Sequence, residues 1–200
     1  SFMWKALNPF GNAVTTGWFN AANYFGHKLV LGGKKPLELY SHHNFWTGKM
    51  PHTRDFCGKH GYMENQVMFP VENAAGCFRQ VIELCQKQRY FPIMSVIKMH
   101  RPDDNLISFS GEAASMTIEW NLKGKSRQEV YRFTQKLMEL ICKLGGKSYL
   151  AKDQILTREL FREMYPGWKK FEELKNQLDP DHSFVSDVWR RLFEGQGKWG

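Results

Sequence analysis

The sequence predicts an α+β fold, in which a mostly antiparallel sheet is flanked by helices and followed by a helical C-terminal segment. Between residues 65 and 120, short apolar runs of strand length surround one run with helical spacing. Residues 126–144 carry a capped amphipathic pattern, and from residue 149 onward only helical patterns recur. The chain has 200 residues, 42% of them hydrophobic, which is enough apolar material for a real core.

The N-terminal part of the chain carries weaker signals. Residues 12–31 indicate a helix, which the following Gly32, Gly33 and Pro36 end, because these residues continue a helix only at high cost. Residues 42–61 contain four histidines, three glycines and Pro51, and this composition indicates a loop at the surface or beside a site.

The central part predicts four strands and two helices. Residues 65–71 indicate a strand, and Asn73 opens a helix with apolar side chains at helical spacing. Three further strands are expected, at residues 92–100, 106–109 and 115–120, with residues 111–114 forming the turn before the last. A capping box at Ser126 to Glu129 opens the second helix, which ends at Gly145-Gly146. Both helices should cover one face of the four-stranded sheet.

The C-terminal part predicts three short helices, at residues 157–164, 167–178 and 184–193, separated by the pairs Tyr165-Pro166 and Asp179-Pro180. The aromatic side chains of these helices are expected to lie mostly in the core.

Composition narrows the function classes. The net charge is +8, but the basic residues are scattered and no nucleic-acid module is present, so phosphate-bearing substrates or lipid head groups are favoured over DNA or RNA. The four cysteines form no C-x-x-C pair, and they are expected to be free thiols. No apolar run approaches a membrane span and no leader is visible, so we expect a cytoplasmic protein, with peripheral membrane association left open.

A metal site is not expected. His42, His43, His52 and His60 lack a helical i,i+4 pair and an accompanying carboxylate set, so surface histidines are the better interpretation. The common catalytic motifs are also missing, among them G-x-S-x-G, the Walker loop and G-x-G-x-x-G. We therefore expect no catalytic residue that would make the chain an enzyme by itself.

Several short motifs occur in a specific order near the C-terminus. They are Gly-Gly-Lys-Ser-Tyr-Leu-Ala-Lys-Asp at residues 145–153, Met-Tyr-Pro at 164–166, Leu-Asp-Pro at 178–180, Phe-Val-Ser-Asp at 184–187 and Arg-Arg-Leu at 190–192. This series resembles the C-terminal signature of FAD-linked oxidases of the vanillyl-alcohol-oxidase family, in particular their decaprenylphosphoryl-ribose oxidase and D-arabinono-lactone oxidase-like branches. Looser similarity at residues 66–70, 95–98 and 108–120 extends the resemblance to residues 4–193.

The resemblance implies a two-domain flavoprotein in which FAD is bound mainly by a domain absent from this chain. Residues 1–148 would form the substrate-binding cap, the FAD-linked oxidase C-terminal fold, and residues 149–200 a helical segment that packs on the FAD domain. Lys152 would contact both flavin and substrate, with Tyr149 on the flavin side. Lys98, Gln66 and Thr117 would bind a sugar or sugar-phosphate substrate. The implied activity is oxidation of a sugar alcohol carbon, the substrate being lipid-linked or a phosphorylated pentose.

Departures and alternatives remain at this stage. Thr117 stands where the resembling enzymes place a cysteine, Met68 replaces a second glutamine, and His100 occupies a position that is usually apolar. From the residues alone, Lys152 could equally be a solvated lysine at a turn, Lys98 could lie on the wet face of an edge strand, and Gln66 could bond only a neighbour in the sheet. The alternative function is a non-catalytic module of the same fold that binds a protein or an anionic lipid.

Overall fold

The computed structural model describes residues 13–31 and 58–196. Most of the expected loop at 42–61 therefore lies outside the described residues, as do His42, His43 and His52. The chain divides into two compact units, one made of residues 1–62 and 121–124, the other of residues 63–120 and 125–200. In the first unit, the expected N-terminal helix is confirmed as α2, Ala13–Leu31, and a short 3-10 helix, η3, spans Gly58–His60.

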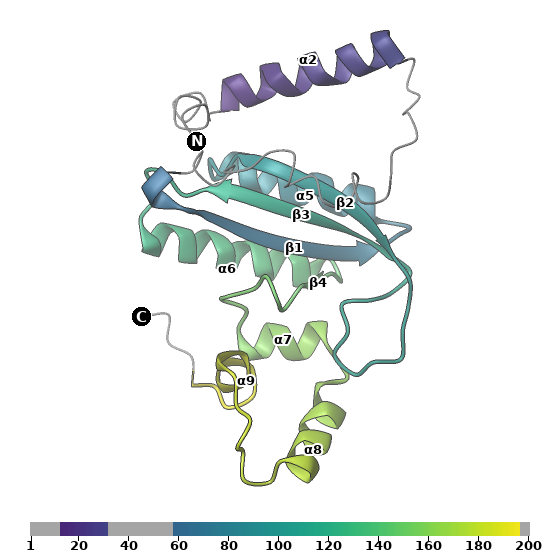
Figure 1. Ribbon diagram of the computed structural model, residues 1–200, viewed down its shortest axis with the longest axis vertical. Helices are drawn as coiled ribbons and strands as arrows, with labels where there is room; N and C mark the ends of the chain where they lie inside the picture. The colour runs from purple at the N-terminus through teal and green to yellow at the C-terminus, as the bar shows by residue number, and fades with distance from the viewer. Residues whose placement is uncertain (1–12, 32–57, 197–200) are drawn as a thin grey trace. The chain divides into compact units, whose positions relative to one another are not determined.

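A four-stranded antiparallel sheet forms the centre of the second unit (Figure 1). Its strands are β1, Tyr62–Pro70, β2, Pro92–His100, β3, Ala113–Asn121, and β4, Lys147–Ser148, in the order β2-β3-β1-β4. The backbone N–H of Val71 donates to the carbonyl of Glu112 at 3.1 Å, so the end of β1 meets the start of β3 and these strands run in opposite directions. In β2 and β3, Lys98 lies directly opposite Ser115.

The strand expected at residues 106–109 is wrong. That segment is a turn within the loop between β2 and β3, and local side chains stabilise it: Asp103 accepts from the backbone N–H of Asn105 at 2.9 Å and from the hydroxyl of Ser108 at 2.6 Å. Such bonds give the backbone an alternative to sheet pairing. The fourth strand is instead β4, and the turn expected at 111–114 is shorter, because β3 begins at Ala113.

Helices α5, Ala74–Lys87, and α6, Arg127–Lys143, contact each other and cover one face of the sheet, as expected (Figure 1). The core lies between them and the strands. Trp120 packs edge-on against Phe133 with ring centroids 5.4 Å apart, and Phe69 against Phe78 at 5.7 Å. Alternation along β1 and β3 therefore sends their large apolar side chains toward the helices.

The expected capping box and the expected free thiols are both present among the described residues. The capping box is complete, since Ser126 accepts from the N–H of Glu129 and the Glu129 carboxylate accepts from the N–H of Ser126. Among the described cysteines, Cys77, Cys85 and Cys142 are free thiols, and burial raises the pKa of Cys85 to about 12. The thiol of Cys85 is thus part of the packing between α5 and the sheet.

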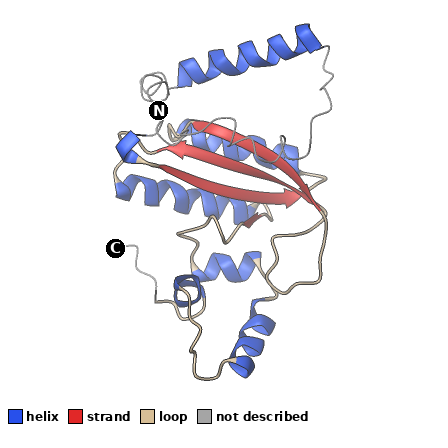
Figure 2. Cartoon of the chain, in the orientation of Figure 1, coloured by secondary structure: helices blue, strands red, loops and turns tan. Residues whose placement is uncertain are grey.

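The C-terminal part is helical, as expected (Figure 2). Its helices are α7, Arg158–Met164, α8, Trp168–Leu178, and α9, Asp187–Leu192. The third is shorter than expected, because Ser186 caps α9 by accepting from the N–H of Trp189, so Phe184 and Val185 precede the helix. Of the aromatic residues, Phe161 and Tyr165 are buried, while Trp168 and Phe171 are half-buried.

Within the described ranges, every helix is too short or too polar to cross a membrane.

Candidate functional site

The face of the sheet opposite α5 and α6 carries a row of polar side chains from several strands. Ile118 and Trp120 of β3 point to the helices, so Ser115 and Thr117 point to the other face. Lys98 of β2 lies opposite Ser115, and the Gln66 side chain of β1 bonds Ser115, so both share that face. The structure thereby brings together three residues predicted as substrate-binding: Lys98, Gln66 and Thr117.

Gln66, Ser115 and His100 form a hydrogen-bonded cluster across β1, β3 and β2. The amide Nε2 of Gln66 donates to Ser115 Oγ at 2.9 Å, and Ser115 Oγ lies 2.7 Å from His100 Nε2. Gln66 is 5% exposed and Ser115 is fully buried. Burial, followed by the positive charge of Lys98, lowers the pKa of His100 from its ordinary value of 6.5. Both effects favour the neutral form of the ring.

Thr117 completes the cluster with an unsatisfied hydroxyl. The residue is 6% exposed, and its Oγ1 has no hydrogen-bond partner in the described structure. A buried hydroxyl without a partner costs about 1–3 kcal/mol. An unsatisfied polar atom of this kind calls for an explanation, and a polar ligand beside the other buried polar groups would supply its missing hydrogen bond.

Tyr149 and Lys152 follow β4 and extend the row past β1. The N–H of Tyr149 donates to the Gln66 carbonyl at 2.9 Å, and the N–H of Lys152 donates to the Tyr149 carbonyl at 2.9 Å, which closes a turn. The ammonium of Lys152 makes an ion pair of 2.9 Å with Glu64, two residues before Gln66 on the same face. The Lys152 side chain remains 40% exposed, so its charge is accessible at the rim of the cluster.

The ring of Phe109 contacts both His100 and Tyr149, which lie at opposite ends of the row of polar side chains. Its ring lies 4.9 Å from that of Tyr149 and 5.4 Å from that of His100, centroid to centroid. Residues 106–109 of the loop between β2 and β3, which were expected to form a strand, thus supply an apolar wall. Flat apolar surface beside hydroxyl and amide groups suits the mixed polarity of a sugar ring.

The structure places Lys98 as its alternative interpretation described, because β2 is an edge strand and Lys98 is exposed. Three residues of this face were missed. The missed residues are Ser115, Glu64 and Phe109. Ser115 could have been found from its two-residue spacing to Thr117, and Glu64 from its spacing to Gln66, whereas no local pattern places Phe109 on Tyr149.

Asp153 is the last residue of the motif at residues 145–153. It bonds the turn after β4 to the C-terminal helices. Its carboxylate accepts from the N–H of Leu156 at 3.0 Å and from the guanidinium of Arg191 at 2.9 Å, and Arg191 also donates to the Leu156 carbonyl at 2.7 Å. The Asp153 side chain is fully buried and that of Arg191 is 15% exposed. Two motifs distant in sequence therefore form one buried contact that positions Lys152.

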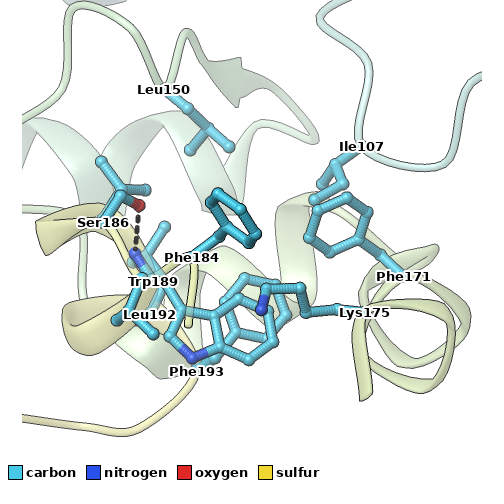
Figure 3. A pocket seen from close by; sticks show the side chains of 11 residues that line it. Ile107, Leu150, Phe171, Lys175, Phe184, Ser186, Trp189, Leu192 and Phe193 are labelled. Atoms are coloured by element: carbon cyan, nitrogen blue, oxygen red, sulfur yellow. Dashed lines mark hydrogen bonds between the residues drawn. The ribbon is translucent and has the colours of Figure 1, made fainter. Parts of the chain in front are cut away.

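A pocket of different character lies among the C-terminal helices. The pocket has a volume of about 470 Å³ and a lining that is almost entirely apolar, in which Phe184 lies near Leu150, Ile107 and Phe171 (Figure 3). Asp179 holds the loop before Phe184, accepting from the ammonium of Lys175 and from the N–H of Phe184 at 3.0 Å. These bonds, the Lys175 contact first, lower the pKa of Asp179 to about 2.

Neither region holds a metal-binding group: among residues 13–31 and 58–196, no cluster of three histidine, cysteine or acidic side chains is suited to an ion.

Known proteins resemble the chain over the part that carries these sites. The D-arabinono-1,4-lactone oxidase family matches residues 59–192. The decaprenylphosphoryl-beta-D-ribose oxidase of Mycolicibacterium smegmatis is 28% identical over 136 residues, which cover 68% of this chain and 28% of that protein. The L-gulono-1,4-lactone dehydrogenase of Mycobacterium tuberculosis is 28% identical over 134 residues, 66% of this chain and 30% of that protein.

An animal protein shows a shorter similarity: the L-gulonolactone oxidase of Mus musculus is 29% identical over 102 residues, 48% of this chain and 22% of that protein. In each comparison the matched part is less than a third of the relative's length. The resemblance inferred from the motifs is thus confirmed. Because the family match covers more than half of the sequence, the chain belongs to the D-arabinono-1,4-lactone oxidase family.

Proposed function

We propose that this chain is the substrate-cap part of an FAD-dependent oxidoreductase that oxidises an alcohol carbon of a sugar. The observation that carries the proposal is the buried cluster of Gln66, Ser115 and Thr117, with one hydroxyl unsatisfied, on the face of the sheet opposite α5 and α6. Amide and hydroxyl groups beside the ring of Phe109 would orient a polyhydroxyl ligand by hydrogen bonds and apolar contact.

Two lysines extend the proposal to an anionic substrate. Lys98 lies at the β2 end of the row and Lys152 at the β4 end, and both side chains reach solvent. An ammonium group is a suitable partner for a phosphate. A phosphorylated or lipid-linked pentose would therefore be attracted to this face, consistent with the net charge of +8.

FAD would be bound mainly by a domain outside this chain. When bound, a flavin accepts the hydride, and the protein contributes orientation and exclusion of water. Lys152 and Tyr149 fit a flavin contact, because a partly exposed ammonium and a tyrosine lie next to the polar cluster. Their role would be to hold the flavin edge beside the substrate.

The apolar pocket supplies a surface for the missing domain. Phe184 is 82% exposed, although it lines the pocket together with Phe171 and Leu150. Exposed aromatic side chains around an apolar hollow are typical of a contact surface. The relatives are more than three times as long as the matched part, so a further domain could cover this pocket.

The first test is an absorbance spectrum, between about 350 and 500 nm, of the protein expressed from its complete natural reading frame. A flavin spectrum that a sugar or sugar-phosphate bleaches without oxygen would support the proposal. Lys152→Met should slow the bleaching at least about tenfold, because it removes a charged hydrogen bond. Lys170→Met, at an exposed helix position, should not.

A colourless complete protein that binds no added FAD would contradict the proposal. In that case a non-catalytic module that binds a protein or an anionic lipid becomes the better explanation, and vesicles with and without anionic lipid would test it.

Thr117 allows a test that separates ligand binding from folding. In the chain alone, Thr117→Val should leave the free energy of unfolding unchanged or raise it by about 1 kcal/mol, because the buried hydroxyl has no partner to lose. In the complete protein, the same change should raise the KM of the sugar.

Thr134→Val is the matched control. The Thr134 hydroxyl donates to the Val130 carbonyl at 2.7 Å inside α6, so its loss should lower the free energy of unfolding by about 1 kcal/mol and leave KM unchanged. Urea unfolding and steady-state kinetics measure the two effects. A Thr117→Val protein as destabilised as Thr134→Val would mean that the Thr117 hydroxyl has a structural role.

A further inference from the structure

The hydrogen bonds around Ser115 leave one acceptor for its hydroxyl proton. A serine hydroxyl has one proton and two acceptor lone pairs. Because Ser115 Oγ accepts from the amide of Gln66, its own proton must be donated to another acceptor. Ser115 is fully buried, and His100 Nε2, at 2.7 Å, is the acceptor in reach among the described residues. With this orientation of the Gln66 amide, a neutral imidazole accepts from Ser115 through Nε2 and carries its hydrogen on Nδ1.

The same bonds fix the orientation of the Gln66 amide. Its Nε2 is directed at Ser115, so the carbonyl Oε1 is the end that remains for a ligand on this face. Gln66 is 5% exposed and lies between neighbouring strands, so an amide flip would break the bond to a fully buried group. Gln66 is thus held as a hydrogen-bond acceptor toward the site.

We propose that His100 is a specificity-determining residue that acts through Ser115, holding Gln66 so that the site selects a ligand hydroxyl that donates a hydrogen bond. His100 itself is a positioning residue, since Ser115 lies between it and Gln66. The inference rests on the proposed function for the identity of the ligand, whereas the arrangement of the three side chains does not.

A change in the charge of His100 should reverse this arrangement. A protonated ring donates from Nε2 to Ser115 Oγ, so the Ser115 proton needs a new acceptor. Oε1 of Gln66 provides one after a flip of the amide, and Nε2 then faces the ligand as a donor. Protonation of His100 would therefore change the site from accepting to donating a hydrogen bond.

The surroundings of His100 place this change on the acidic side. Lys98, on the same strand and face, is the charged group that acts on the ring, while Ser115 and Gln66 from β3 and β1 and Phe109 from the loop are uncharged. Desolvation and the charge of Lys98 both favour the neutral ring. We expect the accepting arrangement at neutral pH and the reversed one below the ordinary histidine range.

Nuclear magnetic resonance of the complete chain tests the arrangement without any ligand or flavin. With ¹⁵N-labelled histidine and glutamine, His100 should show an unprotonated Nε2 at pH 8. Gln66 should show one side-chain proton protected from exchange with solvent.

Two substitutions then separate the hydrogen bond from the shape of the ring. In His100→Phe, which keeps an aromatic ring beside Phe109 but removes the acceptor, the protection of the Gln66 proton should be lost. His100→Gln can still accept from Ser115 and should retain it. Acidification of the unmodified chain should have the same effect as His100→Phe, which keeps the test valid if that variant does not fold.

Protection of the Gln66 proton that survives both acidification and His100→Phe, or a protonated Nε2 at pH 8, would overturn the proposal. If the complete protein proves to be a flavoprotein, His100→Phe should also raise the KM of the sugar about tenfold with kcat within about twofold, as loss of one oriented hydrogen bond would. A flavin spectrum with no change in KM would refute the specificity role alone, whereas a colourless protein with the expected resonances would refute only the enzymatic function.

Discussion

At the scale of single residues, the buried ion pair of Asp153 and Arg191 shows how one contact can fix a site. Asp153 follows Lys152 directly, and its carboxylate is bonded to backbone N–H groups and to Arg191. The pair joins the turn after β4 to helix α9 and so restricts where the Lys152 ammonium can lie. The motif at residues 145–153 therefore combines two tasks, since Lys152 faces outward at the rim and Asp153 faces inward.

Loss of the Asp153 charge should be costly. In Asp153→Asn the guanidinium of Arg191 remains buried without its counter-charge, and the free energy of unfolding should fall by about 3 kcal/mol. Asp187→Asn removes an exposed partner of Arg190 and should lower it by less than about 1 kcal/mol. Urea unfolding measures the free energy lost in each variant. Equal losses would show that the buried ion pair stabilises the fold no more than the exposed one.

At the scale of elements, local signals determine where helix α6 begins and ends. Ser126 and Glu129 satisfy each other's backbone N–H groups, and the bonds to Ser126 lower the pKa of Glu129. A carboxyl whose pKa is lowered on folding stabilises the folded state above its unfolded pKa, and this contribution disappears as the pH falls through the folded pKa. The capping box is therefore strongest at neutral pH.

Ser126→Ala should lower the free energy of unfolding by about 1 kcal/mol at pH 7, because an N-cap acceptor is lost. Gln128→Ala, at an exposed position in the first turn of the same helix, is the control and should change stability little. Thermal or urea unfolding at pH 7 measures the difference. A variant as stable as the original protein would show that solvent replaces the cap without cost.

The two glycines that end α6 act for different reasons. Gly145 has a φ of +69°, a conformation that favours glycine. At Gly146 a Cβ atom would lie 2.8 Å from the carbonyl oxygen of Met68 and would collide with the ring of Phe69. Gly146 thus permits close contact between the chain entering β4 and strand β1.

Gly146→Ala should therefore be more damaging than Gly145→Ala. The Gly145 variant should lose about 1 kcal/mol of stability from backbone strain, whereas the Gly146 variant should lose about 2 kcal/mol or more because a packed core must shift. Chemical denaturation of the two proteins gives the order. The reverse order would imply that the backbone around Gly146 adjusts easily.

At the scale of the whole molecule, the exposed apolar surface around Phe184 is where we propose that a further domain makes contact. The loop that carries Phe184 is held by Asp179, so its exposed position does not reflect a lack of local bonds. A ring held outward beside an apolar pocket contributes little to the fold of this chain.

Phe184→Ser should change the free energy of unfolding of the chain alone by less than about 0.5 kcal/mol, because the ring is 82% exposed. In the complete protein the same change should lower the thermal stability and weaken retention of the flavin. Leu178→Ser, 77% exposed but outside the pocket, should do neither. Equal behaviour of both variants in the complete protein would remove Phe184 from the proposed domain contact.

Much of the fold could be predicted because its signals are local. The bounds of β2, the capping box of α6 and the end of that helix at Gly145 follow from residues within a turn or a strand of each other. The family could be inferred for a similar reason, since the motifs between residues 145 and 192 are short and ordered.

By itself the sequence determined the fold class, most of the elements and the family, all of which depend on periodicity, capping and motif order. Only the tertiary structure decided that β4 replaces the strand expected at 106–109, that β2 lies at the edge of the sheet, and that His100, Ser115 and Gln66 are bonded. The physical reason is that strand order and cross-strand contacts join residues 15 to 81 positions apart. Such pairing depends on how the whole sheet packs, and it cannot be predicted from a local sequence pattern.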